Sequence, residues 1–293
     1  MTTGAIDEAH LRQWIGREEV AEDVLTESLA ARFQATLALP GEAARTGQVA
    51  PRLIHFCLCQ PAVPTDELGE DGHPALTGEF LPPVPLPRRM WAASEIEFSG
   101  DVRVGEDVRR RSRIADVAVK HGRSGTLCFV NVEHEISTGG KVVVFDRQSI
   151  VYREATPAPV PGSPPPELPR ANPPAPAGEV SAIVDATSAL LFRYSAITFN
   201  SHRIHYDLPY ATGEEGYPAL VVQGPLQATL LLHFAARCRE GRPPDRFAFR
   251  AQSPLFAPGQ VELHCGADGN GELSLWTCRP GGPVAMSATA VWR

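Results

Sequence analysis

The spacing of apolar residues predicts an amphipathic helix near the start of the chain. Within residues 22–39, four large apolar side chains recur at every fourth position, so they lie on one face of a helix. These residues are Leu25, Leu29, Phe33 and Leu37. We therefore expect a helix over residues 22–39 with this face turned toward a core.

A second helix is predicted to begin at Gly224 and Pro225, because proline is favoured at the first helical position. Apolar residues cover most of the circumference of its turns, and such a helix belongs inside a core. Residues 216–236 hold 21 positions without Asp, Glu, Lys or Arg, which on length alone would cross a membrane. Glycine, proline, glutamine and histidine interrupt this stretch, so we expect no membrane insertion.

Alternating or apolar runs rich in β-branched and aromatic residues predict ten strands, with a hairpin turn at Gly139 and Gly140. The predicted strands are residues 52–59, 96–104, 108–119, 125–136, 141–153, 193–200, 245–252, 260–265, 272–279 and 284–292. Their short connections indicate antiparallel meanders rather than a parallel sheet.

Two proline-rich stretches divide the chain. Residues 156–178 contain ten of the 28 prolines and are expected to form an extended linker between residues 1–155 and 179–293. Each of these halves is predicted to hold one principal helix and four or five antiparallel strands, so the pattern occurs twice. Residues 60–89 contain seven prolines and are typical of a lid or binding loop.

Composition narrows the classes of function. The chain of 293 residues is 43% hydrophobic and 21% charged, as expected for a globular protein. Its net charge of -7 gives no basic surface for nucleic acid, which we do not expect as a partner. Six cysteines without a CxxC pair, and an N-terminus that lacks a signal sequence, favour a cytoplasmic protein with reduced thiols.

Titratable side chains concentrate in residues 201–207, which read SHRIHYD. Two histidines, an arginine, a tyrosine and an aspartate within seven positions indicate a functional site. His205, with an ordinary pKa near 6.5, suits a general base. The helix that begins at Gly224 offers free N–H groups and the positive end of its dipole to a developing negative charge.

Two segments then suggest a family. Residues 199–207, FNSHRIHYD, resemble the hydratase motif of MaoC-like enoyl-CoA hydratases, in which an Asp is followed five positions later by a His. Residues 68–92, LGEDGHPALTGEFLPPVPLPRRMWA, resemble the FAS1-like dehydratase branch of that superfamily, with itaconyl-CoA and mesaconyl-CoA hydratases as the most similar members. The resemblance implies an α+β double hotdog fold in which each half wraps an antiparallel sheet around a central helix.

The resemblance also implies a reaction and residues that perform it. The expected reaction is addition of water across the α,β double bond of a short branched or dicarboxylic enoyl-CoA, without metal or redox cofactor. His205 matches the catalytic histidine of the family, while Asn200 stands where the superfamily has aspartate and is expected to orient water or the thioester. His202 stands where the family has asparagine. Gly224 is expected beside the substrate as a backbone donor.

Other interpretations remain open for each of these residues. Arg88 and Arg89 are candidates for binding CoA phosphates or a substrate carboxylate, although arginines at a loop end are usually solvated. Asn200 and His205 would also suit a strand cap and a solvated loop, and Gly224 a simple helix start. Asp207 and the neighbouring Tyr206 are expected to be structural, and His73 a turn residue.

Alternative functions are a 3-hydroxyacyl-thioester dehydratase acting on longer chains and a non-catalytic acyl-CoA binding module. A thioesterase is a weaker alternative, because the spacing of Asn200 and His205 matches the hydratase motif. Exposed sheet edges favour a homodimer.

Overall fold

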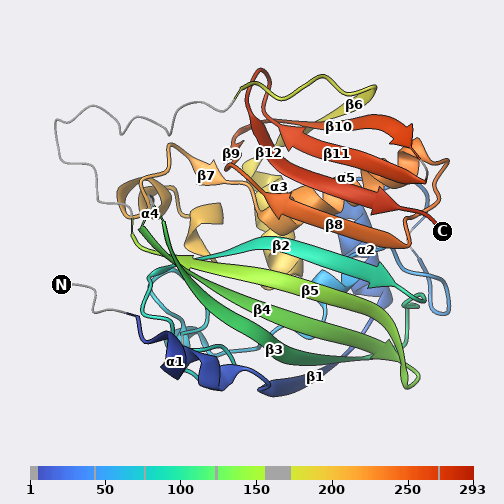
Figure 1. The fold of residues 1–293 in the computed structure, drawn as a ribbon. Helices are drawn as coiled ribbons and strands as arrows, with labels where there is room; N and C mark the ends of the chain where they lie inside the picture. The colour runs from blue at the N-terminus through green and yellow to red at the C-terminus, as the bar shows by residue number, and fades with distance from the viewer. Residues whose placement is uncertain (1–5, 43, 76, 123–124, 156–172, 270) are drawn as a thin grey trace.

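The computed structural model describes residues 6–42, 44–75, 77–122, 125–155, 173–269 and 271–293. Its main feature is one ten-stranded antiparallel sheet with the order β1-β3-β4-β5-β2-β8-β12-β11-β10-β6 (Figure 1). The strands are β1 (Glu18–Val24), β2 (Arg88–Phe98), β3 (Asp107–Gly122), β4 (Gly125–Thr138), β5 (Lys141–Arg153), β6 (Val180–Ala186), β8 (Arg246–Ala251), β10 (Gly259–Gly269), β11 (Glu272–Cys278) and β12 (Val284–Val291).

The sheet consists of two halves with the same connectivity. Reading outward from the centre, β2-β5-β4-β3-β1 in the first half corresponds to β8-β12-β11-β10-β6 in the second. β2 and β8 join the halves, with Ala93 opposite Arg250 and Glu97 opposite Arg246. The repeated pattern inferred from the sequence is therefore present as a repeated topology, and the two halves share one continuous sheet.

Three helices lie on one side of this sheet (Figure 1). α2 (Glu27–Thr36) and α3 (Ser188–Ile197) each follow an edge strand, and each begins at a threonine whose hydroxyl accepts the N–H three residues later at 3.1 Å. α5 (Gly224–Cys238) packs against β10, β11, β12, β8 and β2. Its start at Gly224 confirms the prediction, and ten of its fifteen residues are buried.

As expected, the first half has one principal helix, α2, which corresponds to α3 in the second half. The second half adds α5, the expected buried helix, whereas the buried residues Ile54–Cys57 between α2 and β2 form a 3-10 turn, η2. Residues 52–59 were expected to form a strand. Leu53 and Cys59 instead have φ values of 67° and 56°, in the left-handed region, which ends any strand at both sides of the turn.

Two further boundaries differ from the prediction. Residues 193–200 do not form a strand: residues 193–197 belong to α3, in which Leu191, Tyr194 and Ser195 are buried at helical spacing, and residues 198–200 follow that helix. Tyr194 and Ile197 favour a strand when each is considered alone, but helix capping and packing outweigh these propensities here. The first helix covers only Glu27–Thr36, since residues 22–24 belong to the edge strand β1.

The remaining elements are short. They are α1 (Glu8–Leu11), η1 (Arg12–Trp14), η3 (Thr65–Glu67), η4 (Arg203–His205), α4 (Leu208–Gly213), β7 (Leu220–Val221) and β9 (Phe256–Ala257). Most of the expected linker, residues 156–172, lies outside the described residues. Within the described part of the chain, every helix is too short or too polar to cross a membrane.

Candidate active site

Two segments far apart in sequence form the site. The loop of residues 69–73 comes from the first half, and residues 200–207 follow α3 in the second half. Three contacts join them: Ser201 Oγ donates to the carbonyl of Gly72, the N–H of Arg203 donates to the carbonyl of Asp71 at 2.9 Å, and the Arg203 guanidinium donates to the carbonyl of Glu70 at 2.9 Å. The loop therefore lies directly against the His-rich turn.

Gly72 makes this close approach possible. Its φ is +85°, and a Cβ added there would lie 2.1 Å from the carbonyl oxygen of Ser201. Any side chain at this position would push the two segments apart, because the neighbouring atom belongs to the backbone. The glycine is thus required by the contact itself.

His205 lies in η4 with 7% of its surface exposed. Its Nδ1 lies 2.7 Å from the carbonyl oxygen of Val221 in β7. Because a carbonyl can only accept, Nδ1 carries the proton and the neutral ring keeps its lone pair on Nε2. Burial lowers the pKa of His205 to about 4, and the hydrogen bond to Val221 only partly opposes this shift. His205 is therefore a neutral base at ordinary pH.

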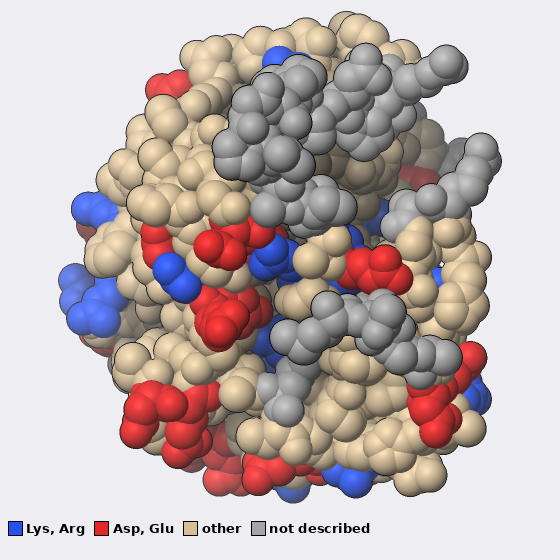
Figure 2. Space-filling model, turned by 90° about the vertical axis from the view of Figure 1, so that its left-hand side faces the viewer, with Lys and Arg blue, Asp and Glu red and all other residues tan. Residues whose placement is uncertain are grey.

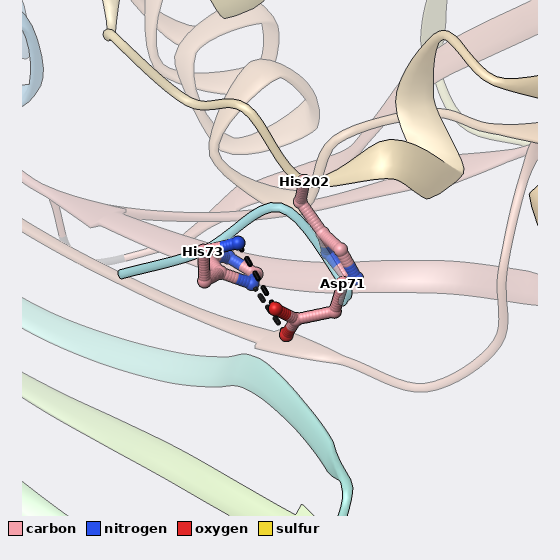
Figure 3. A group of neighbouring side chains, drawn as sticks. All are labelled: Asp71, His73 and His202. Carbon is pink, nitrogen blue, oxygen red and sulfur yellow. Dashed lines mark hydrogen bonds and ion pairs between the residues drawn. The ribbon is translucent and has the colours of Figure 1, made fainter. Parts of the chain in front are cut away.

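Asp71 and His73 lie beside His202 (Figure 3), whose ring contacts that of His205. The Asp71 carboxylate accepts from the backbone N–H of His73 at 3.0 Å and from its ring Nδ1 at 2.9 Å. The ring of His73 packs on that of His202 with centroids 4.2 Å apart, and His202 meets His205 edge-on at 5.4 Å. The three imidazoles form a continuous row, and the Asp71 carboxylate lies beside its first two rings, with an oxygen within 4.8 Å of a ring nitrogen of both His73 and His202.

Charge in this row is unevenly distributed. Burial raises the pKa of Asp71, but the hydrogen bonds and the charge of His73 outweigh it and lower the pKa to about 2. Burial first, and then the neighbouring His73 and His205, lower the pKa of His202 to about 2. Burial also lowers the pKa of His73. At neutral pH the row consists of neutral rings and one carboxylate.

Asn200 and Asp207 support the turn that carries the histidines. The side-chain oxygen of Asn200 accepts the backbone N–H of His202 at 3.0 Å, so the amide oxygen belongs to the turn. Asp207 caps α4 by accepting the N–H of Tyr210 at 3.2 Å and forms an ion pair with Arg203 at 2.8 Å. The structural role expected for Asp207 is confirmed.

Arg88 and Arg89, at the start of β2, have different surroundings. Arg88 is 2.5 Å from the carboxylate of Glu215, a residue that is only 7% exposed, and it also donates to the carbonyl of Glu214. Arg89 forms no ion pair with any described residue, yet its charge contributes to lowering the pKa of both His73 and His202. Arg88 therefore holds the segment after α4, while Arg89 retains an uncompensated charge beside the site.

Both signs of charge occur on the surrounding face. Figure 2 shows the side on which α4 lies in Figure 1, and basic and acidic side chains lie next to one another near its centre. No single-sign patch covers the visible, described part of this face. The positive charge near the histidines is thus local.

Gly224 lies at the start of α5, three residues after Val221, whose carbonyl binds His205. No side chain caps this end of the helix, so its first N–H groups remain without helical partners. A Cβ at Gly224 would lie 3.7 Å from the carbonyl oxygen of Trp91, an ordinary contact distance. Packing within the chain therefore does not require a glycine here.

The structure thus brings His202 and His205 into contact within the field of Arg89, whereas Arg88 is occupied by Glu215. Gly224 follows three residues after Val221, the partner of His205. Asp71 and His73 were not among the predicted site residues, although His73 lies in a turn as expected. Their signal was the segment DGHP within residues 68–92, and only the fold shows that it meets residues 200–207. Atoms of Asp71, His73 and His202 that could bind a metal lie within 4.8 Å of one another, but the Asp71–His73 hydrogen bond already accounts for their closeness.

Comparison with known proteins identifies the family. A family model described as hydroxyacyl-thioester dehydratase type 2 matches residues 53–257, and these include both site segments. The chain is also 42% identical to mesaconyl-C(4)-CoA hydratase of Chloroflexus aurantiacus over 276 residues, which cover 94% of this chain and 95% of that protein. The chain belongs to the hydroxyacyl-thioester dehydratase type 2 family. The expectation that it is an enzyme of the hydratase and dehydratase class is thereby confirmed.

Solved structures confirm the α+β double hotdog fold. HtdX of Mycobacterium tuberculosis aligns with a TM-score of 0.64 and 22% identity over 93% of this chain and 98% of that chain. Another protein from the same organism, described as having a double hotdog fold, aligns with a TM-score of 0.53 and 15% identity over 94% and 96% of the two chains. At these identities the likeness concerns the fold alone.

We predict that Gly72→Ala lowers the free energy of unfolding by about 2 kcal/mol more than Gly78→Ala. Both variants put alanine into a strained backbone conformation, which costs about 1–3 kcal/mol, but only Gly72→Ala adds a clash with a backbone atom. Both glycines have positive φ, but a Cβ at Gly78 would meet its nearest neighbour, a Trp14 side-chain atom, at an ordinary 3.4 Å. Urea unfolding of the two variants measures the difference. Equal losses would show that the contact with Ser201 adds nothing.

Proposed function

We propose that this protein is a hydro-lyase that adds water across the α,β double bond of an enoyl-CoA thioester. The observation that carries the proposal is the bond between His205 Nδ1 and the Val221 carbonyl, because it leaves Nε2 of a buried neutral imidazole free as a base and anchors the ring three residues before the start of α5. A base and an uncapped helix N-terminus are the two groups that hydration of a conjugated thioester requires.

The reaction can be written with these groups. His205 Nε2 takes a proton from water while the water oxygen bonds to the β-carbon, and the electron pair of the double bond moves to the thioester oxygen. The enolate then takes the same proton from His205 at the α-carbon, which restores the neutral ring. General base catalysis of this kind contributes roughly 10²–10⁴ in rate.

The N-terminus of α5 is suited to the thioester oxygen. Its free N–H groups and dipole stabilise the negative charge that develops on that oxygen, and removal of one such donor usually costs about 10²–10³ in turnover. The space beside Gly224 supports this role, since no described protein atom would lie closer than 3.7 Å to a Cβ there. Gly224 is accordingly proposed as the point of closest approach of the substrate to the backbone.

For the acyl group, we propose a short branched or dicarboxylic chain of the itaconyl or mesaconyl kind. Its second carboxylate would bind Arg89, whose charge has no acidic partner among the described residues. Arg89 lies two residues before Trp91, whose carbonyl is beside Gly224, so it is roughly 7 Å farther along β2. This short separation suits a small acyl group. The 42% identity to mesaconyl-C(4)-CoA hydratase supports the same substrate class.

A second candidate is dehydration of 3-hydroxyacyl thioesters with longer, unsubstituted chains. The description of the matching family favours it, since it names hydroxyacyl thioesters. The two candidates share the acid–base chemistry and differ in the acyl group, so a comparison of substrates distinguishes them.

We predict that His205→Ala slows hydration by about 100-fold or more, because the variant lacks the group that takes the proton from water. Loss of enoyl-thioester absorbance with itaconyl-, mesaconyl- and crotonyl-CoA measures the rate. His121→Ala, which removes an exposed imidazole on β3, is the matched control and should retain full activity. A wild-type protein that binds these esters without consuming them would be a binding module, and release of free thiol would indicate a thioesterase.

The pH dependence follows from the lowered pKa of His205. Since its folded-state pKa is about 4, the base stays neutral and kcat should not fall between about pH 8 and about pH 5.5. Stability should fall over the same interval, because below the ordinary value of 6.5 the unfolded chain binds protons that the buried ring does not. Initial rates and melting temperatures across this range test both statements. A kcat that halves near pH 6.5 would contradict the assignment.

We predict that Arg89→Gln raises KM for a dicarboxylic ester about 10- to 100-fold and changes KM for crotonyl-CoA less than about threefold. The reason is that only the dicarboxylic ester carries a charge for Arg89 to bind. Arg246→Gln on β8, whose side chain is half exposed and paired with Glu97, is the control. Equal effects on both esters would assign Arg89 to the fold or to CoA itself.

A further inference from the structure

The site lacks a carboxylate where the superfamily motif has one. Residue 200 is asparagine, and its side-chain oxygen is bonded to the backbone N–H of His202. An amide carries no charge at any working pH, so it cannot compensate a positive charge on His205. The carboxylate must come from elsewhere in the chain if the reaction uses one.

Two carboxylates lie near the histidines. Glu215 is held by Arg88 at 2.5 Å, and its nearest oxygen is 4.0 Å from His202 Nε2. Asp71 forms no ion pair with a lysine or arginine among the described residues, and both of its oxygens are directed to His73. Asp71 therefore has a net negative charge to offer, whereas that of Glu215 is already compensated.

We propose that Asp71, supplied by the first half of the chain, is the positioning carboxylate of this active site and acts through His73 and His202 on His205. The inference rests on the proposed function. Asp71 thereby takes the role that the superfamily motif assigns to residue 200. It lies 129 positions earlier in the chain and is brought into place by the contact of Gly72 with Ser201.

The geometry explains how Asp71 acts. Since a carboxylate accepts, His73 carries its proton on Nδ1 and keeps its lone pair on Nε2, as His205 does. The hydrogen bond of 2.9 Å also fixes the plane of the His73 ring, on which His202 packs at 4.2 Å. His202 in turn borders His205 at 5.4 Å. A change at Asp71 thus reaches the base through two ring contacts.

The charge of Asp71 serves the proton transfer. When His205 takes the proton from water, a positive charge forms in a buried position, and a nearby carboxylate stabilises it. The proton passes on to the α-carbon, so Asp71, His73 and His202 end the cycle unchanged. The other charged or titratable groups around this row include Arg89 from β2, the Arg88–Glu215 pair, Arg153 and Tyr152 from β5, Arg203 from η4 and Tyr210 from α4.

Asp71→Asn tests the proposal, because an asparagine keeps the acceptor for the His73 backbone N–H but turns an N–H group toward His73 Nδ1. We expect kcat for hydration to fall about 10- to 100-fold with KM changed less than about threefold, as for loss of an interaction made in the transition state. Asp66→Asn removes an exposed carboxylate from the same loop and should leave both parameters unchanged. Wild-type kcat in Asp71→Asn would overturn the proposal.

The tautomer of His73 gives a readout that does not depend on activity. Nitrogen NMR of labelled imidazoles should show His73 with its proton on Nδ1 in the wild type and on Nε2 in Asp71→Asn, with His73→Gln used to assign the signal. An unchanged tautomer would overturn the proposal even if the protein hydrates no ester tested. If the protein hydrates no ester tested but the tautomer does switch, only the proposed function has failed.

A double-mutant cycle tests the route through His73. If Asp71 acts through this ring, Asp71→Asn should slow hydration no further once His73→Gln is present. Multiplying effects would show that Asp71 acts independently of His73 and would overturn the route. Melting temperatures of all variants establish that they are folded under the assay conditions.

Discussion

The site depends on the docking of residues 69–73 against residues 201–203. A sheet shared by both halves fixes the distance between the two segments, and the backbone contacts of Gly72 and Asp71 with Ser201 and Arg203 then set their orientation. These contacts use main-chain atoms on at least one side, so they depend little on most side chains. They do require a glycine at position 72, because a Cβ there would clash with the backbone of Ser201. The carboxylate, the imidazole row and the turn that holds them are positioned by this contact.

Burial determines the chemistry of the positioned groups. Histidines in water titrate near neutral pH, but here desolvation favours the neutral rings and hydrogen bonds select the nitrogen that carries the proton. The two neighbouring arginines also differ in their surroundings: the charge of Arg88 is compensated by Glu215, whereas that of Arg89 has no acidic partner among the described residues. Two adjacent residues therefore provide a structural ion pair and a charge beside the site.

Much of the fold follows from local patterns. The long strands β3, β4 and β5 and the start of α5 at Gly224 were predicted from alternation and from the position of proline, whereas β2 covers Arg88–Phe98 rather than the expected 96–104. Residues 193–200 and 52–59 were not predicted correctly, because β-branched and aromatic residues there are packed in a helix and in a 3-10 turn flanked by residues with positive φ. Propensity describes a residue in isolation, whereas these two segments are determined by the core they fill.

The candidate site was predictable in part. His205, His202 and the end of α5 lie within one stretch of sequence, so their clustering was visible there. Asp71 and His73 lie more than 120 residues away, and no spacing rule links them to that stretch. Only the pairing of the two halves brings them together, so the sequence alone offered no other carboxylate in place of the one missing at residue 200.

The 3-10 turn at Ile54–Cys57 gives the duplication a further meaning. The second half holds the buried helix α5 with an N-terminus that no side chain caps, whereas Ile54–Cys57 in the first half form a single short turn of buried side chains. Under the proposed function, the first repeat supplies Asp71 and Arg89 to a reaction centre whose base and helix belong to the second repeat. Neither repeat is therefore expected to function when separated from its twin.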